Sequence, residues 1–405
     1  MKPSLNITTI FFTCLILLRI AINTLPIVNQ NSGFLVNFGS IVLIYILIFF
    51  HYQEHKVNFR IESCIILFSL SLLSLLYSIF DFSQFLINLY GIAQEMIWFF
   101  LGFYIISNNN RRQARLILFF LTSCWVFTGI TTYIGNQNFP QVSRLMTAGM
   151  LEDKETFNMY QNMNIGSFTY VYCLTLLTPI LVYIKRFSLS FNLFSLLMLF
   201  GVLILIIKTE FTTALLFTFF AILLLILPQN FRRYHIFLLL IIVGLLGVTF
   251  PALFRYLAEN SDSELFSERF TSLFDFASSG ASGVNSESDL GYRLDAWGQS
   301  IEGFLSNPFL GTLGSGGSHS YIFDTICQYG LLGLISIIMI FRKEYNLYIR
   351  PFLKYDIAPF LYILFIFNLL LCFINTLNNI FIITFFIPLF IAAFRDDIKE
   401  RKYSF

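Results

Sequence analysis

Long apolar runs, separated by short polar segments, dominate the chain. Runs long enough to cross the hydrocarbon core, which takes about 20 residues as a helix, occur twelve times. We place them at residues 6–27, 34–51, 60–80, 85–107, 114–134, 165–184, 188–207, 211–227, 234–254, 320–341, 358–376 and 379–394. This pattern predicts an all-α polytopic membrane protein with about twelve transmembrane helices in a single domain, residues 1–405.

The distribution of basic residues predicts the orientation of these helices. With both termini in the cytoplasm, the inner segments hold eighteen lysines and arginines and the outer segments hold six. Inner loops of membrane proteins carry the excess of positive charge, so this orientation is expected. The first run lacks a small-residue cleavage site and is interrupted by Arg19, and we therefore expect it to be a span and not a signal peptide.

Two predicted outer segments, 135–164 and 255–319, are much longer than the inner loops. Long loops in compact proteins are usually functional or disordered. In the second segment Leu294, Trp297, Ile301 and Phe304 recur at three- and four-residue spacing, which predicts a short amphipathic helix. We therefore expect the functional surface of the protein on the outer side of the membrane.

Composition narrows the function classes. Only 12% of the residues are charged, about half the usual fraction of a soluble domain, and no basic patch of nucleic-acid type is present. The six cysteines lie inside apolar runs, so we expect no disulfide. No metal-binding motif and no P-loop occurs in the sequence, and we expect no cofactor, no metal and no nucleotide-driven step.

His319 is the single histidine on the predicted outer side and stands at the start of the run 320–341. Ser318 or Ser320 is able to cap this helix, which would leave the imidazole available for chemistry. In the alternative interpretation His319 has no chemical role and is simply a polar residue at the start of the helix.

Arg293 precedes the amphipathic helix in "GYRLDAW". An arginine there can make bidentate contacts to a lipid phosphate, or it can form an ordinary surface salt bridge with Asp289 or Asp295. The same two interpretations apply to the other outer arginines, Arg144, Arg255 and Arg269.

Four further charges lie at or inside the spans. Lys208 and Glu210 stand at an outer boundary and either snorkel to the interface or take part in function. Arg19 and Glu95 are deeper, where charges are costly and usually functional, although the two could also pair with each other.

The stretch "GYRLDAWGQSIEGFLSNPFLGTLGSGGSHSYIFDTICQYGLLG", residues 291–333, resembles the signature of the O-antigen polymerase and ligase superfamily. The shared order is Arg-Leu, an aromatic residue, an apolar helix, Asn-Pro-Phe, a glycine-rich turn, His, and finally Tyr-Gly-Leu-Leu-Gly. The resemblance covers about a tenth of the chain, and the similar position after the largest outer loop adds to it.

This resemblance implies a glycosyltransferase of the C type in the bacterial inner membrane, active at the periplasmic face in lipopolysaccharide or other polysaccharide synthesis. Such enzymes transfer a glycan from undecaprenyl pyrophosphate to an acceptor without nucleotide sugar or metal. By position, Arg293 would bind the pyrophosphate and His319 would act near the acceptor or leaving group. Family members often have an arginine just before the span that "TEFTTALL", residues 209–216, matches. This sequence has Thr212 there, and Lys208 one turn earlier is our substitute.

Ser320 and Asp324, which follow the histidine, are more similar to polymerases than to ligases. A polymerase is therefore favoured, and a ligase that transfers the glycan to the lipid A core stays an alternative. A polyprenol-linked glycan flippase is the alternative of another class, although its spans would carry more charge than these do. The expected partners are an undecaprenyl pyrophosphate-linked oligosaccharide and membrane lipids, with a chain-length regulator left open. The predicted site comprises His319 as the catalytic residue, Arg293, Lys208, Arg255 and Arg269 as pyrophosphate ligands, and Arg144, Glu210 and Asp324 as secondary candidates.

Overall fold

The computed structural model describes residues 7–55, 61–108, 110–146, 154–184, 189–223, 252, 254–260, 264–279, 284–285, 288–312, 319–375 and 380–400. Every regular element in these ranges is helical. Five helical segments there are long and apolar enough to cross a membrane: Gly33–Phe50, Phe82–Asn108, Arg111–Asn138, Asn192–Thr209 and Tyr321–Phe352. The chain is therefore a helical membrane protein.

Most predicted runs coincide with a helix, and the twelve-span count stays a prediction. The helices on these runs are α1 (Ile7–Thr24), α3 (Gly33–His55), α6 (Phe82–Asn108), α7 (Arg111–Asn138), α10 (Phe168–Ile184), α11 (Leu189–Thr209), α12 (Thr212–Leu223), α16 (Tyr321–Glu344), α17 (Ala358–Ile374), η4 (Ile382–Phe386) and α18 (Ile387–Ala393). The run 60–80 is divided at Phe68 into α4 (Ile61–Leu67) and α5 (Ser69–Tyr77). The run 234–254 lies almost wholly outside the described residues.

The two long polar segments also contain helices. The first includes α8 (Val142–Leu145) and α9 (Lys154–Asn162), and the second includes α14 (Glu264–Ser279) and α15 (Asp289–Ser306). The helix predicted from the spacing of apolar residues over 294–304 is confirmed as the body of α15. It begins with Ser288, whose hydroxyl accepts a hydrogen bond from the Gly291 amide at 3.1 Å, as expected of an N-cap serine.

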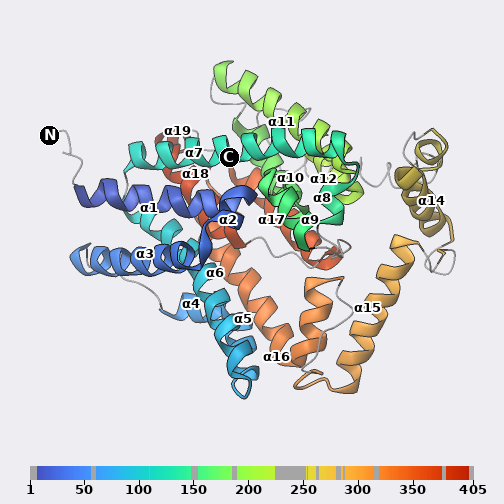
Figure 1. Ribbon diagram of the computed structural model, residues 1–405, viewed down its shortest axis with the longest axis horizontal. Coiled ribbons are helices and arrows are strands. Elements are labelled where there is room, and N and C mark those ends of the chain that lie inside the picture. The colour runs from blue at the N-terminus through green and yellow to red at the C-terminus, as the bar shows by residue number, and fades with distance from the viewer. Residues whose placement is uncertain are drawn as a thin grey trace.

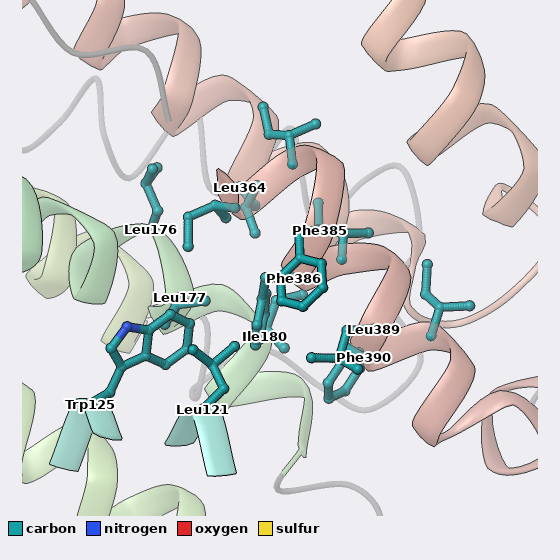
Figure 2. Packing of buried hydrophobic residues seen from close by; sticks show 14 of the residues in the cluster. Leu121, Trp125, Leu176, Leu177, Ile180, Leu364, Phe385, Phe386, Leu389 and Phe390 are labelled. Atoms are coloured by element: carbon teal, nitrogen blue, oxygen red, sulfur yellow. The ribbon is translucent and has the colours of Figure 1, made fainter. Parts of the chain in front are cut away.

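The bundle has two packed groups of helices that share a core. α1 packs on α3 and α7, and α18 packs on α6 and α7, while α10 contacts α11, α12 and α17 (Figure 1). Aromatic and branched side chains from α7, α10, η4 and α18 meet at the centre (Figure 2), where the rings of Trp125 and Phe386 lie 5.5 Å apart. Large apolar side chains such as Leu35 (83% exposed) and Phe119 (73%) remain on the outside, as a lipid-facing surface requires.

Helix α16 is broken at Gly330, so the predicted run 320–341 is not one straight helix. Gly330 has φ 58° and ψ −142°, and Figure 1 shows the two legs of α16 meeting beside the end of α15. The break leaves two backbone groups that neighbouring residues satisfy. Leu331 N–H donates to the Pro308 carbonyl at 2.8 Å, and Thr312 N–H donates to the Cys327 carbonyl at 2.9 Å. The Asn-Pro-Phe turn and the Tyr-Gly-Leu-Leu-Gly segment are therefore one structural unit.

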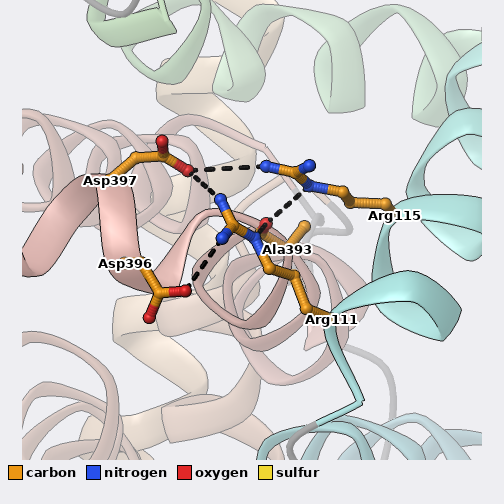
Figure 3. Close-up of polar contacts among 5 residues, drawn as sticks. All are labelled: Arg111, Arg115, Ala393, Asp396 and Asp397. Atoms are coloured by element: carbon orange, nitrogen blue, oxygen red, sulfur yellow. Dashed lines mark hydrogen bonds and ion pairs between the residues drawn. The ribbon is translucent and has the colours of Figure 1, made fainter. Parts of the chain in front are cut away.

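The beginning of α7 is fastened to the end of α18 and to α19 (Arg395–Glu400). Arg111 pairs with Asp396 at 2.8 Å and with Asp397 at 2.6 Å, and both Arg111 and Arg115 donate to the Ala393 carbonyl (Figure 3). The ion pairs are partly exposed, and such pairs contribute little each. Two of the arginines counted on the predicted inner side thus have a structural role at a helix end.

Candidate functional site

The starts of α15 and α16 meet the end of α17 at Asn375. Asn375 is 4% exposed and its carbonyl accepts the Tyr321 N–H at 2.9 Å. Arg293 donates through Nη1 to Asn375 Oδ1 at 3.0 Å and to the Ile374 carbonyl at 3.3 Å. The last carbonyls of a helix lack partners inside it, which is why the end of α17 accepts donors from two other helices. One asparagine therefore fixes Arg293 relative to the first turn of α16.

His319 lies immediately before α16 and against α15. Its imidazole ring meets the ring of Tyr292 edge-on, with centroids 5.0 Å apart, and its carbonyl accepts a long hydrogen bond of 3.5 Å from Trp297 Nε1. Ser320 is the N-cap of α16, and its hydroxyl accepts the Phe323 N–H at 3.2 Å. The prediction that a serine caps this helix is confirmed.

Asp324, a secondary candidate, holds α15 and α16 together. One carboxylate oxygen accepts the Ser300 hydroxyl at 2.8 Å, and the other accepts the Ser320 N–H at 3.1 Å. With both oxygens so engaged, Asp324 orients Ser320, the residue next to His319.

Arg269 of α14 reaches the connection between α11 and α12. Its Nη1 donates to the Glu210 carbonyl at 3.1 Å and to Thr212 Oγ1 at 3.3 Å. Glu210 itself has φ 57°, a left-handed conformation that turns the chain between the two helices. Thr212 is the position at which the resemblance calls for an arginine, and the guanidinium of Arg269 lies at that position.

Tyr172 of α10 is 2% exposed and interacts electrostatically with both Arg293 and Arg269. The side chains of Thr213 and Asn375 are also neighbours of its hydroxyl. Two cations 24 positions apart in the sequence therefore act on one buried phenol, and guanidinium groups are suited to an anion with more than one charged oxygen.

Sequence reasoning missed Asn375 and Tyr172. The sequence marked Asn375 only weakly, as a polar residue at the end of an apolar run. Tyr172 had none, because the chain has 20 tyrosines and nothing in the local pattern distinguishes this one.

The other candidates lie apart from this convergence. Lys208 is exposed at the end of α11. Arg255 pairs with Glu259 at 2.9 Å, and both side chains are largely exposed, which is the ordinary surface pair considered above. Arg144 lies on α8, which packs on α11, and no described residue accepts a hydrogen bond from its buried Nη1. The phosphate roles of these three residues stay predictions.

Within the described ranges, no three histidine, cysteine, aspartate or glutamate side chains come together as a metal-binding group. A scan of the chain against protein-family models gives no match, and neither does a comparison with curated protein sequences. The arrangement itself offers two positioned guanidinium groups, a buried phenol and an imidazole at the start of a neighbouring helix.

Proposed function

We propose that the chain is a polysaccharide polymerase of the O-antigen polymerase and ligase superfamily, a C-type glycosyltransferase with about twelve spans. In this proposal it lies in the bacterial inner membrane with both termini in the cytoplasm and acts at the periplasmic face. Its donor is a glycan on undecaprenyl pyrophosphate, and its acceptor is a sugar hydroxyl of another lipid-linked repeat unit. The placement of Arg293 on Asn375, whose carbonyl also accepts the Tyr321 N–H of the helix that begins after His319, is the observation that carries the proposal.

The reaction breaks the bond between the anomeric carbon of the donor glycan and a pyrophosphate oxygen. A new bond forms from the acceptor hydroxyl oxygen to that carbon. Negative charge grows on the leaving pyrophosphate, and Arg293 and Arg269 stabilise it as fixed hydrogen-bond donors. The hydroxyl proton passes to the neutral imidazole of His319, which acts as the general base.

The second pyrophosphate contact, which the sequence assigned to Lys208, is better made by Arg269. Arg269 hydrogen-bonds to Thr212 Oγ1 at 3.3 Å, whereas Lys208 is exposed at the end of its helix. We therefore assign the second pyrophosphate contact to Arg269 and retain Lys208 as a weaker candidate.

Purified protein incubated with a lipid-linked oligosaccharide repeat unit tests the proposal. A polymerase makes a ladder of longer lipid-linked glycans and releases polyprenyl pyrophosphate in equal steps. A product that forms only when lipid A core is added would identify a ligase instead. Movement of the unchanged lipid across a vesicle membrane, with no new glycosidic bond, would identify a flippase and overturn the proposal. Arg350→Ala, a change at an exposed residue far along the chain, serves as the matched control for Arg293→Ala.

A further inference from the structure

A cavity of about 470 Å³ lies inside the helix bundle. Its wall is built from α1, α2 (Pro26–Asn31), α6, α7, α9, α10 and the residues just before η4. The volume falls within the range of roughly 300–1,000 Å³ typical of ligand pockets. Neither Arg293, Arg269 nor His319 lines it, so it is distinct from the site described above.

Two charged side chains inside the spans face this cavity. Arg19 is 3% exposed and donates through Nη1 to Asn37 Oδ1 at 2.9 Å, while no described residue accepts a hydrogen bond from its Nε. Glu95 accepts the Ser71 hydroxyl at 2.9 Å. No ion pair among the described residues joins the two, so the possibility that they neutralise each other is not realised there. Such charges within spans are expensive and usually functional.

The rest of the wall combines aromatic rings with amide and hydroxyl groups. Trp98 and Trp125 contribute indole rings, and each side chain is otherwise buried. The amides of Asn23, Gln94 and Gln161 add planar donors and acceptors. An acyl chain would use none of these polar groups. A sugar uses both kinds, because its hydroxyls hydrogen-bond to amides and charged groups while its C–H faces pack on aromatic rings.

The cavity and the arginine site share helix α10. Tyr170 and Cys173 of α10 line the cavity, whereas Tyr172 of the same helix interacts electrostatically with Arg293 and Arg269. One helix therefore belongs to both sites.

We infer that this cavity binds the sugar portion of the acceptor, with Arg19 and Glu95 as hydrogen-bonding partners of the sugar and Trp98 and Trp125 as stacking surfaces. The inference rests on the proposed function, since it names where the acceptor glycan of that reaction is held. The ligand class is a hydroxyl-rich oligosaccharide.

Tryptophan fluorescence measures binding without any transfer. The chain has three tryptophans, so the Trp297→Phe protein reports only from Trp98 and Trp125. The probe is the free oligosaccharide repeat unit, released by mild acid from the polysaccharide of the cell that carries this chain. A saturable fluorescence change is expected, and Arg19→Gln and Glu95→Gln should each weaken binding at least about tenfold. Glu62→Gln and Arg350→Gln, which change exposed residues outside the cavity, should bind as before.

Equal affinity in the cavity variants and the controls overturns the inference. The inference is also overturned if polyprenyl phosphate without sugar gives the saturable change and competes with the oligosaccharide. Glu95→Gln is nearly isosteric and remains informative if Arg19→Gln fails to fold. Arg293→Ala separates the two proposals, because it should abolish transfer and leave this binding intact. Tight binding by a protein that never extends a glycan would refute the polymerase and leave the cavity assignment standing.

Discussion

Gly330→Ala tests whether the motif of residues 291–333 is held together as the structure describes. Gly330 has φ 58° and ψ −142°, a region that only glycine enters readily and that costs other residues about 1–3 kcal/mol. A Cβ at this position would lie 2.6 Å from the Pro308 carbonyl oxygen and 2.7 Å from the Gly311 nitrogen. Both are backbone atoms, which cannot rotate away, and overpacking of this kind costs about 1–3 kcal/mol more.

The two terms act on the same residue, so we expect Gly330→Ala to destabilise the protein by about 2–6 kcal/mol. Thermal unfolding in detergent, followed by tryptophan fluorescence, measures the change. Gly298→Ala is the matched control, because it lies in α15 with no atom within 4 Å of an added Cβ. Alanine in a helix should stabilise that variant by about 0.5–1 kcal/mol.

The variant should also lose transfer activity beyond the loss of folded protein. The turn around Pro308 joins the far end of α15 to the break in α16, and Arg293 lies on α15 while His319 immediately precedes α16. If Gly330→Ala unfolds at the same temperature as Gly298→Ala, the proposed packing of the turn into the break of α16 is wrong.

Three other predictions concern the arginine site. Arg293→Ala should abolish glycan extension while membrane insertion is unchanged, and Arg293→Lys should keep part of the rate because the charge survives without the planar fork; wild-type product length in the alanine variant would exclude the pyrophosphate role. Arg269→Ala should lower the transfer rate at least about a hundredfold, as loss of a transition-state donor does, whereas Lys208→Ala should have a much smaller effect, and the reverse order in the same rate assay would return the second contact to Lys208. Transfer should persist in EDTA, since guanidinium groups take the place of a metal at the leaving group; loss of turnover with chelator and its recovery with magnesium or manganese would contradict this.

The sequence predicted those features that depend on local pattern. The spacing of Leu294 and Trp297 indicated α15, and a serine next to His319 was expected to cap α16, as Ser320 does. Apolar length located most helices. These properties follow from periodicity and from the backbone groups at helix ends, both of which are visible in a short window.

Features that depend on contacts between distant segments were not predictable. The break of α16 at Gly330 requires a backbone approach from Pro308, more than twenty positions earlier. Arg269 was one of several equivalent outer arginines until the fold brought it to Thr212. Asn375 joins Arg293 to the first turn of α16, but in the sequence it is marked only as a polar residue at the end of an apolar run. Apolar pattern specifies which segments become helices, but it does not specify which polar side chains meet between them.

The central claim is that His319 accepts the proton of the attacking sugar hydroxyl at this site. The most direct test is the single-turnover rate of glycan transfer by purified wild-type, His319→Ala and His319→Asn proteins across pH 5 to 8, with binding of the lipid-linked donor measured in parallel. We expect both variants to lose about two to four orders of magnitude in rate while they bind the donor normally. The wild-type rate should fall as the imidazole becomes protonated at low pH, because a protonated base cannot accept the proton, and that fall should be absent in the variants. Full activity of His319→Asn, or a wild-type rate that rises as the imidazole becomes protonated, would contradict the account.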